Sequence, residues 1–139
     1  MRIVLFTVEE ANKLVPELRT KLERLVAKKR EFDRLEARMD ILLVATAGAA
    51  ADNPDALELR GLGEKRRRLG EGIGRGVQEL HEQGVLVKDL DRGLVDFYAL
   101  AGDRLIYLCW LLGETEVAHW HTLEGGFTAR QPLKEIGLD

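Results

Sequence analysis

The sequence predicts an α+β protein in which a long antiparallel two-helix hairpin is followed by a small antiparallel β-sheet. Over residues 7–83 apolar side chains recur every three, four or seven positions, which is the spacing of amphipathic helices. After Gly84 the apolar spacing changes to two, which is typical of strands. The 139 residues are enough for one domain with a buried core. We therefore expect a single domain over 1–139, with the hairpin at 7–83, the sheet at 85–121, and a loop and tail at 122–139.

The N-terminal residues contain a clear helix start. Met1–Phe6 is short and apolar, so we expect an edge strand or an extended lead-in. In the capping box that follows, the Thr7 hydroxyl can accept from the Glu10 backbone N–H, and the Glu10 carboxylate can reach back to Thr7. The first helix should continue to about Thr46, a length of roughly 60 Å. Pro16 removes one backbone hydrogen bond, so we expect a bend just before it.

A second helix of matching pattern follows the turn at Gly48–Pro54. Asn53 and Pro54 are a helix start signal, and Gly84 is suited to follow the helix end. When the apolar positions of the two helices are paired antiparallel, the residue numbers of five pairs add up to 101 or 102. One register therefore satisfies all five contacts, which predicts a helical hairpin. The pairs are Leu42–Leu59, Met39–Leu62, Phe32–Leu69, Leu25–Val77 and Leu22–Leu80.

The second helix also contains four glycines at alternate positions from Gly70 to Gly76. In a helix interior they cost roughly 3–4 kcal/mol relative to alanine. Alternation places them on all sides of the helix and not on one packing face. We expect either that the helix bends or frays here, or that its backbone closely approaches a neighbour. Their spacing does not match that of a phosphate-binding loop.

Charge and composition limit the partner classes. The net charge is −3, and the hairpin register places the basic run Lys65–Arg68 beside Glu31, Asp33 and Glu36, so we expect ion pairs between the helices and no nucleic-acid partner. No run of 18 apolar residues is present, and the first residues lack the apolar centre of a signal peptide. With one cysteine only, these features favour a cytoplasmic protein without a membrane partner.

Four strands are predicted after the hairpin, with turns at 101–103 and 112–115. They are Val85–Lys88, Leu94–Tyr98, Arg104–Trp110 and Glu116–His121. His119 and His121 are two residues apart in the last strand, so both rings should lie on one face. This spacing occurs in metal sites.

The register of the last two strands decides which residues join the histidines. An even pairing sum places Tyr107 and Cys109 beside them, whereas an odd sum places Leu108 and Trp110 there. In the even register four candidate ligands for a divalent metal ion would converge. These are His121, His119, Asp96 and Cys109. Alternatively, His121 closes a hydrogen-bond network and His119 faces solvent.

The segment KDLDRGLVD, residues 88–96, contains candidate ligand-binding residues. Alternating acids can bind a cation or perform acid–base chemistry. Such a run is more typical of a turn in which an aspartate bonds its own backbone and Gly93 adopts a positive φ. Arg92 and Arg130 are candidate contacts to an acidic ligand. The candidate ligand-binding set is Asp91, Arg92, Asp96 and Arg130.

Several motifs together resemble one bacterial protein family. They are FTVEEAN at 6–12, DLDRGLVDF at 89–97, YLCW at 107–110, LGE at 112–114 and WH at 120–121, with Gly126, Phe127, Arg130 and Pro132 after them. The sequence resembles the family called domain of unknown function 2203 over nearly its whole length. The resemblance implies a small bacterial protein and brings no established activity. Tyr98 stands where the family pattern has proline, and His119 where tyrosine is common, which makes His121 the better metal candidate.

No catalytic motif of known mechanism is present, so whether the protein is an enzyme is left open and two functions are considered. The first is a non-enzymatic interaction module that forms a homodimer and can bind a protein partner, as the long apolar seam suggests. The second is a metal- or small-ligand-binding protein, with hydrolysis as its candidate chemistry, whose site lies in the C-terminal β segment around His121 and Asp96.

Overall fold

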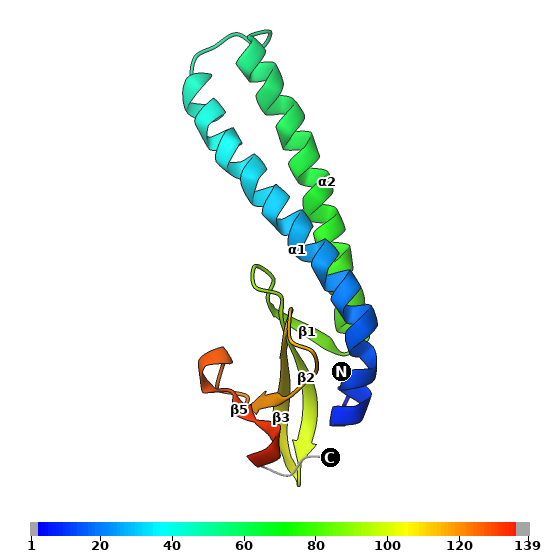
Figure 1. Ribbon diagram of the computed structural model, residues 1–139. Coiled ribbons are helices and arrows are strands. Elements are labelled where there is room, and N and C mark those ends of the chain that lie inside the picture. The colour runs from blue at the N-terminus through cyan, green and yellow to red at the C-terminus, as the bar shows by residue number, and fades with distance from the viewer. Residues whose placement is uncertain (1–2, 136–139) are drawn as a thin grey trace.

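The computed structural model describes residues 3–135 and contains two long helices and a five-stranded sheet (Figure 1). Helix α1 is Val8–Ala45 and helix α2 is Pro54–Glu82. The strands are β1 (Val85–Asp89), β2 (Leu94–Ala101), β3 (Arg104–Leu111), β4 (His119–His121) and β5 (Gln131–Pro132), with short 3₁₀ helices η1 (Phe127–Ala129) and η2 (Leu133–Glu135). All strand pairs are antiparallel, in the order β1-β2-β3-β4-β5. The predicted α+β class is confirmed.

The predicted helix ends are confirmed. The backbone N–H of Thr7 donates to Glu10 Oε1 at 2.9 Å, and the Glu10 N–H donates to Thr7 Oγ1 at 3.1 Å, which completes the capping box. The helix then continues through Pro16. Asn53 caps α2 by accepting from the two N–H groups that follow Pro54.

The predicted register of the hairpin is also confirmed. Arg66 pairs with Glu36 at 3.3 Å, and a Cβ added to Gly70 would lie 3.3 Å from Phe32 Cε2; both pairs of numbers add up to 102. Lys65 pairs with Glu31 at 2.8 Å. The expectation for Asp33 is wrong, because this carboxylate bonds Lys29 one turn earlier on its own helix.

The alternating glycines lie within an unbroken α2, so helix fraying is not seen. Gly70 and Gly76 face α1 and approach Phe32 and Leu25 closely, whereas Gly74 faces open space. The expected close approach of the helix backbone to a neighbour is therefore seen at Gly70 and Gly76, and not along the whole series.

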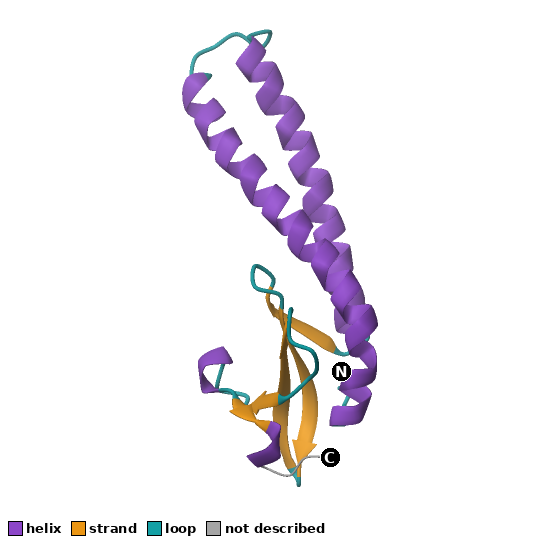
Figure 2. Ribbon diagram, in the orientation of Figure 1, coloured by secondary structure: helices purple, strands orange, loops and turns teal. Residues whose placement is uncertain are grey.

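Figure 1 shows that the hairpin extends away from the sheet, and Figure 2 shows that this arm is helical up to its connecting turn. Only the lower part of the arm contributes to the main core, where α1 packs on one face of the sheet. Its largest buried residues include Leu22 of α1 and Phe97, Leu108 and Trp110 of the sheet. Within residues 3–135, neither helix is apolar enough over a bilayer's thickness to span a membrane.

Three chain segments differ from the prediction or refine it. The fourth strand is limited to β4, because the Val117 N–H donates to Asn12 Oδ1 of α1 at 2.6 Å and not to a neighbouring strand. The expected tail instead returns to the sheet, where β5 pairs with β4. The lead-in is extended, with one parallel bridge between Leu5 and Tyr98. Residues 1–2 and 136–139 of the expected lead-in and tail lie outside the described residues.

Candidate functional site

The sheet has the even register between β3 and β4. Tyr107 is opposite His121 and Cys109 is opposite His119, while Asp96 of β2 is opposite Cys109. Because side chains alternate along a strand, all five lie on one face of the sheet. The core-forming side chains of the same strands, such as Leu108, lie on the other face, toward α1.

Asp96, Cys109 and His121 form a buried cluster on this face. Their exposed fractions are 1%, 0% and 2%, and one donor atom of each lies within 4.8 Å of the others. His121 Nδ1 is 2.8 Å from the Thr122 carbonyl oxygen. A carbonyl can only accept, so Nδ1 carries a proton and donates.

The other ring nitrogen of His121 contacts a carboxylate. Nε2 lies 3.1 Å from both Asp96 oxygens, a contact that is a hydrogen bond when either the ring nitrogen or the carboxyl group carries a proton. Burial raises the pKa of Asp96, and the charge and hydrogen bond of His121 oppose this effect. The arrangement is a histidine oriented by a backbone carbonyl, with its second nitrogen aimed at an acid.

Cys109 is not activated as a nucleophile in this setting. Burial, reinforced by the negative charge of Asp96, raises the pKa of its thiol to about 12. A thiol needs a lowered pKa to react near neutral pH, which a metal ion or a cationic neighbour can supply. The cluster therefore resembles a ligand set more than a catalytic dyad.

His119 takes part in a separate network. Arg130 Nη2 lies 2.6 Å from His119 Nδ1 and donates to both oxygens of Glu114 at 2.9 and 2.7 Å. The structure thus groups three of the four candidate metal ligands and places His119 beside them. It also gives Arg130 an internal partner.

The four candidate ligand-binding residues are not gathered into one site, although two of them, Arg92 and Arg130, contact the same aromatic ring. Asp91 is exposed and pairs with Lys29 of α1 at 2.9 Å. Arg92 donates to Asp89 at 2.9 Å, in the turn that the sequence indicated. The guanidinium groups of Arg92 and Arg130 both stack on the Phe127 ring, with Cζ 4.7 and 4.9 Å from its centre.

Sequence reasoning missed two residues near the cluster. Lys88 Nζ lies 4.4 Å from the centre of the Tyr107 ring, which in turn is 5.2 Å from the His121 ring. The period of two in β1 could have indicated the face of Lys88. Glu114 lies in a turn, where its carboxylate accepts hydrogen bonds from Arg130 and from the Leu111 N–H. No sequence spacing indicates that Arg130, 16 residues away, is its partner.

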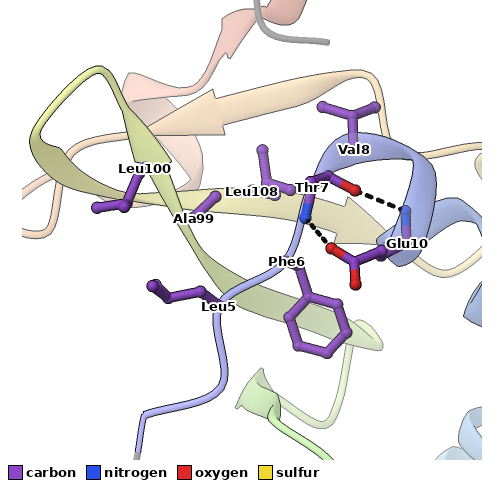
Figure 3. A pocket seen from close by; sticks show the side chains of 8 residues that line it. All are labelled: Leu5, Phe6, Thr7, Val8, Glu10, Ala99, Leu100 and Leu108. Atoms are coloured by element: carbon purple, nitrogen blue, oxygen red, sulfur yellow. Dashed lines mark hydrogen bonds between the residues drawn. The ribbon is translucent and has the colours of Figure 1, made fainter.

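A cavity of about 400 Å³ lies elsewhere, between the lead-in and the end of β2 (Figure 3). Leu5, Phe6 and Leu108 are among its mainly apolar lining residues. Figure 3 shows the Thr7–Glu10 capping box at its rim. Because Leu108 belongs to the core face, this cavity is separate from the buried cluster.

Comparison with known proteins identifies a family. A family model described as "Uncharacterized conserved protein (DUF2203)" matches residues 4–133, so the chain belongs to this family. No curated protein and no solved structure matches the chain.

Proposed function

We propose that this member of the DUF2203 family is a non-enzymatic interaction module that forms a homodimer through the distal part of its helical arm. One observation supports the proposal above all. Large apolar side chains near the end of the arm are exposed: Val44 is 81% exposed, Ile41 61%, Leu43 57% and Leu57 50%.

Ile41, Leu43 and Val44 belong to α1 and Leu57 belongs to α2. The position of Ile41 and Val44 on α1 explains why α2 does not cover them. Met39 and Leu42 are buried on the side of α1 that faces α2. Ile41 and Val44 are three residues apart and lie on another side of the same turns. A hairpin of two helices has no third helix to cover that side, so the apolar stripe formed by Ile41 and Val44 remains exposed to water.

A second copy of the chain would cover this stripe with its own. Two hairpins packed in this way give a four-helix bundle with two-fold symmetry, in which each apolar stripe meets the same stripe of the partner. Full burial of an aliphatic side chain contributes about 1.5–3 kcal/mol, so Ile41 and Val44 of each copy together favour association.

The test is the molar mass measured by light scattering after size-exclusion chromatography, over a dilution series. We expect the wild type to have the mass of a dimer and the double variant Ile41→Lys/Val44→Lys to have that of a monomer. Leu100→Lys is the matched control, because Leu100 is also an exposed apolar residue, 46% exposed, but lies in the sheet. A monomeric wild type, or a dimeric double variant, would refute the proposal.

A second candidate function is metal or small-ligand binding in the sheet. The observation that favours it is the convergence of Asp96, Cys109 and His121. Because these groups are nearly inaccessible to solvent, they suit an ion better than an organic substrate, and hydrolysis would require the covering chain to move. Elemental analysis of untagged protein tests the metal-binding function, since it measures bound metal whatever the site. The absence of metal and of any thermal shift with added Zn²⁺, Ni²⁺ or Mn²⁺ would exclude metal binding.

A further inference from the structure

We propose that Asp96, Cys109 and His121 bind a single zinc ion, which links strands β2, β3 and β4. This inference rests on the second function proposed above and specifies its ion, its ligands and its role. It starts from the three donor groups, which come from three neighbouring strands, lie on the same face of the sheet and are buried there.

The spacing of the donors is close to that of a zinc site. With Zn–N and Zn–O distances of about 2.0 Å and Zn–S of about 2.3 Å, tetrahedral ligands lie roughly 3.3–3.6 Å apart. His121 Nε2 and the Asp96 oxygens are already 3.1 Å apart. Since no pair of donors in the cluster exceeds 4.8 Å, side-chain adjustments of roughly 1 Å are enough.

The orientation of His121 is that of a ligand. A histidine that binds zinc through one ring nitrogen usually donates its other N–H to a backbone carbonyl or a carboxylate. The bond from Nδ1 to the Thr122 carbonyl does this here and leaves Nε2 directed at Asp96. Nε2 is equidistant from both carboxylate oxygens, so the contact is not a bond to one oxygen alone.

The charges of the cluster also favour a divalent ion. A thiolate, a carboxylate and a neutral imidazole carry two negative charges, which Zn²⁺ neutralises in a buried environment where an uncompensated charge is costly. The ion takes the place of the thiol proton and of the proton between Asp96 and His121. The sulfur ligand selects zinc over Mg²⁺ and Ca²⁺, which prefer oxygen donors.

The role that follows is a cross-link of the sheet. The cluster is buried, and its residues are 13, 12 and 25 positions apart in the chain. A zinc ion held by all three therefore ties β4, which has only three residues, to the two long central strands. Binding to the folded state alone raises thermal stability.

Cobalt(II) spectroscopy tests the assignment sharply, because Cys109 is the only cysteine in the chain. A near-ultraviolet sulfur-to-cobalt charge-transfer band can therefore come from this residue alone. After stripping with a chelator, the full-length protein is titrated with Co²⁺ and then with Zn²⁺. We expect the band to saturate at one Co²⁺ per chain and to disappear as Zn²⁺ displaces it, with a rise in melting temperature.

Variants locate the other ligands. Cys109→Ser should abolish the band, and Asp96→Asn and His121→Ala should weaken Co²⁺ binding by at least roughly tenfold. His81→Ala is the matched histidine control, because His81 is exposed on α2, and it should leave the titration unchanged. Far-ultraviolet circular dichroism shows whether each variant is folded, while the wild-type titration remains decisive if one is not.

Two results would overturn the assignment, and they are distinguishable. If Co²⁺ or Zn²⁺ binds without the sulfur band, or if the band survives in both Asp96→Asn and His121→Ala, the protein binds metal but not with this ligand set. If no metal binds at a hundredfold excess over protein, the metal-binding function fails together with the site.

Discussion

Replacing Gly76 by alanine tests whether close approach between the helices explains the glycines of α2. A Cβ added at Gly76 would clash with Leu25 Cδ2 and would lie 3.3 Å from both Leu25 Cγ and Cδ1. Leu25 is only 5% exposed, so its side chain has little room to move away. At Gly74, two residues earlier in the same helix, nothing lies within 4 Å of the added Cβ. The two positions therefore form a matched pair.

The magnitudes follow from two opposing effects. Alanine is favoured over glycine in a helix by about 0.8–1.0 kcal/mol, so Gly74→Ala should stabilise the protein by this amount. Gly76→Ala gains the same propensity but adds volume to a packed seam, which costs about 1–3 kcal/mol. It should therefore be neutral or destabilising by up to about 2 kcal/mol, and the difference between the two variants measures the packing cost.

Urea denaturation followed by circular dichroism gives these free energies of unfolding. It should be performed with a chelator present and at one protein concentration, because metal binding and dimer formation would change the apparent stability. Leu25→Val removes a methylene group at the contact. It should therefore lower the free energy of unfolding less in the Gly76→Ala background than in the wild type. If Gly76→Ala stabilises the protein as much as Gly74→Ala does, the explanation by close approach is wrong.

Three further predictions concern the capping box and the cysteine. Thr7→Ala removes the acceptor for the Glu10 N–H and should cost about 1 kcal/mol in urea denaturation, whereas Thr20→Ala, at an exposed mid-helix position, should not destabilise; equal effects would contradict the role of the cap. The backbone hydrogen bond from Thr7 lowers the pKa of Glu10 from 4.5, so ionisation of Glu10 favours the folded state, and that stability is lost as pH falls through the lowered pKa. The melting temperatures of the wild type and of Glu10→Gln should thus differ near pH 7 and become equal in acid, which thermal melts at a series of pH values will measure. Because Cys109 is buried and its pKa is raised to about 12, iodoacetamide should modify it only in denaturant, and intact-mass detection of rapid labelling in native buffer would refute this.

The elements that the sequence predicted well depend on local bonds or on periodicity. The capping box joins residues three apart, and Asn53 caps α2 from the residue before Pro54, so both can be read from a few letters. The hairpin register follows from two helical periods that must coincide. The common face of Asp96 and Cys109 similarly follows from strand alternation and a tight turn at Gly102.

The remaining features depend on contacts between segments that are distant in the chain. The even register of β3 and β4 was one of two alternatives, and the return of β5 and the pairing of Arg130 with Glu114 had no spacing to indicate them. Sequence alone placed His119 and His121 on one face, but only packing directed His121 to Asp96 and His119 to Arg130. Local hydrogen bonds and side-chain periods thus determined the elements of this protein. The composition of its buried cluster was decided by the three-dimensional packing of the strands, because its residues come from three strands whose register is set by contacts between segments distant in the chain.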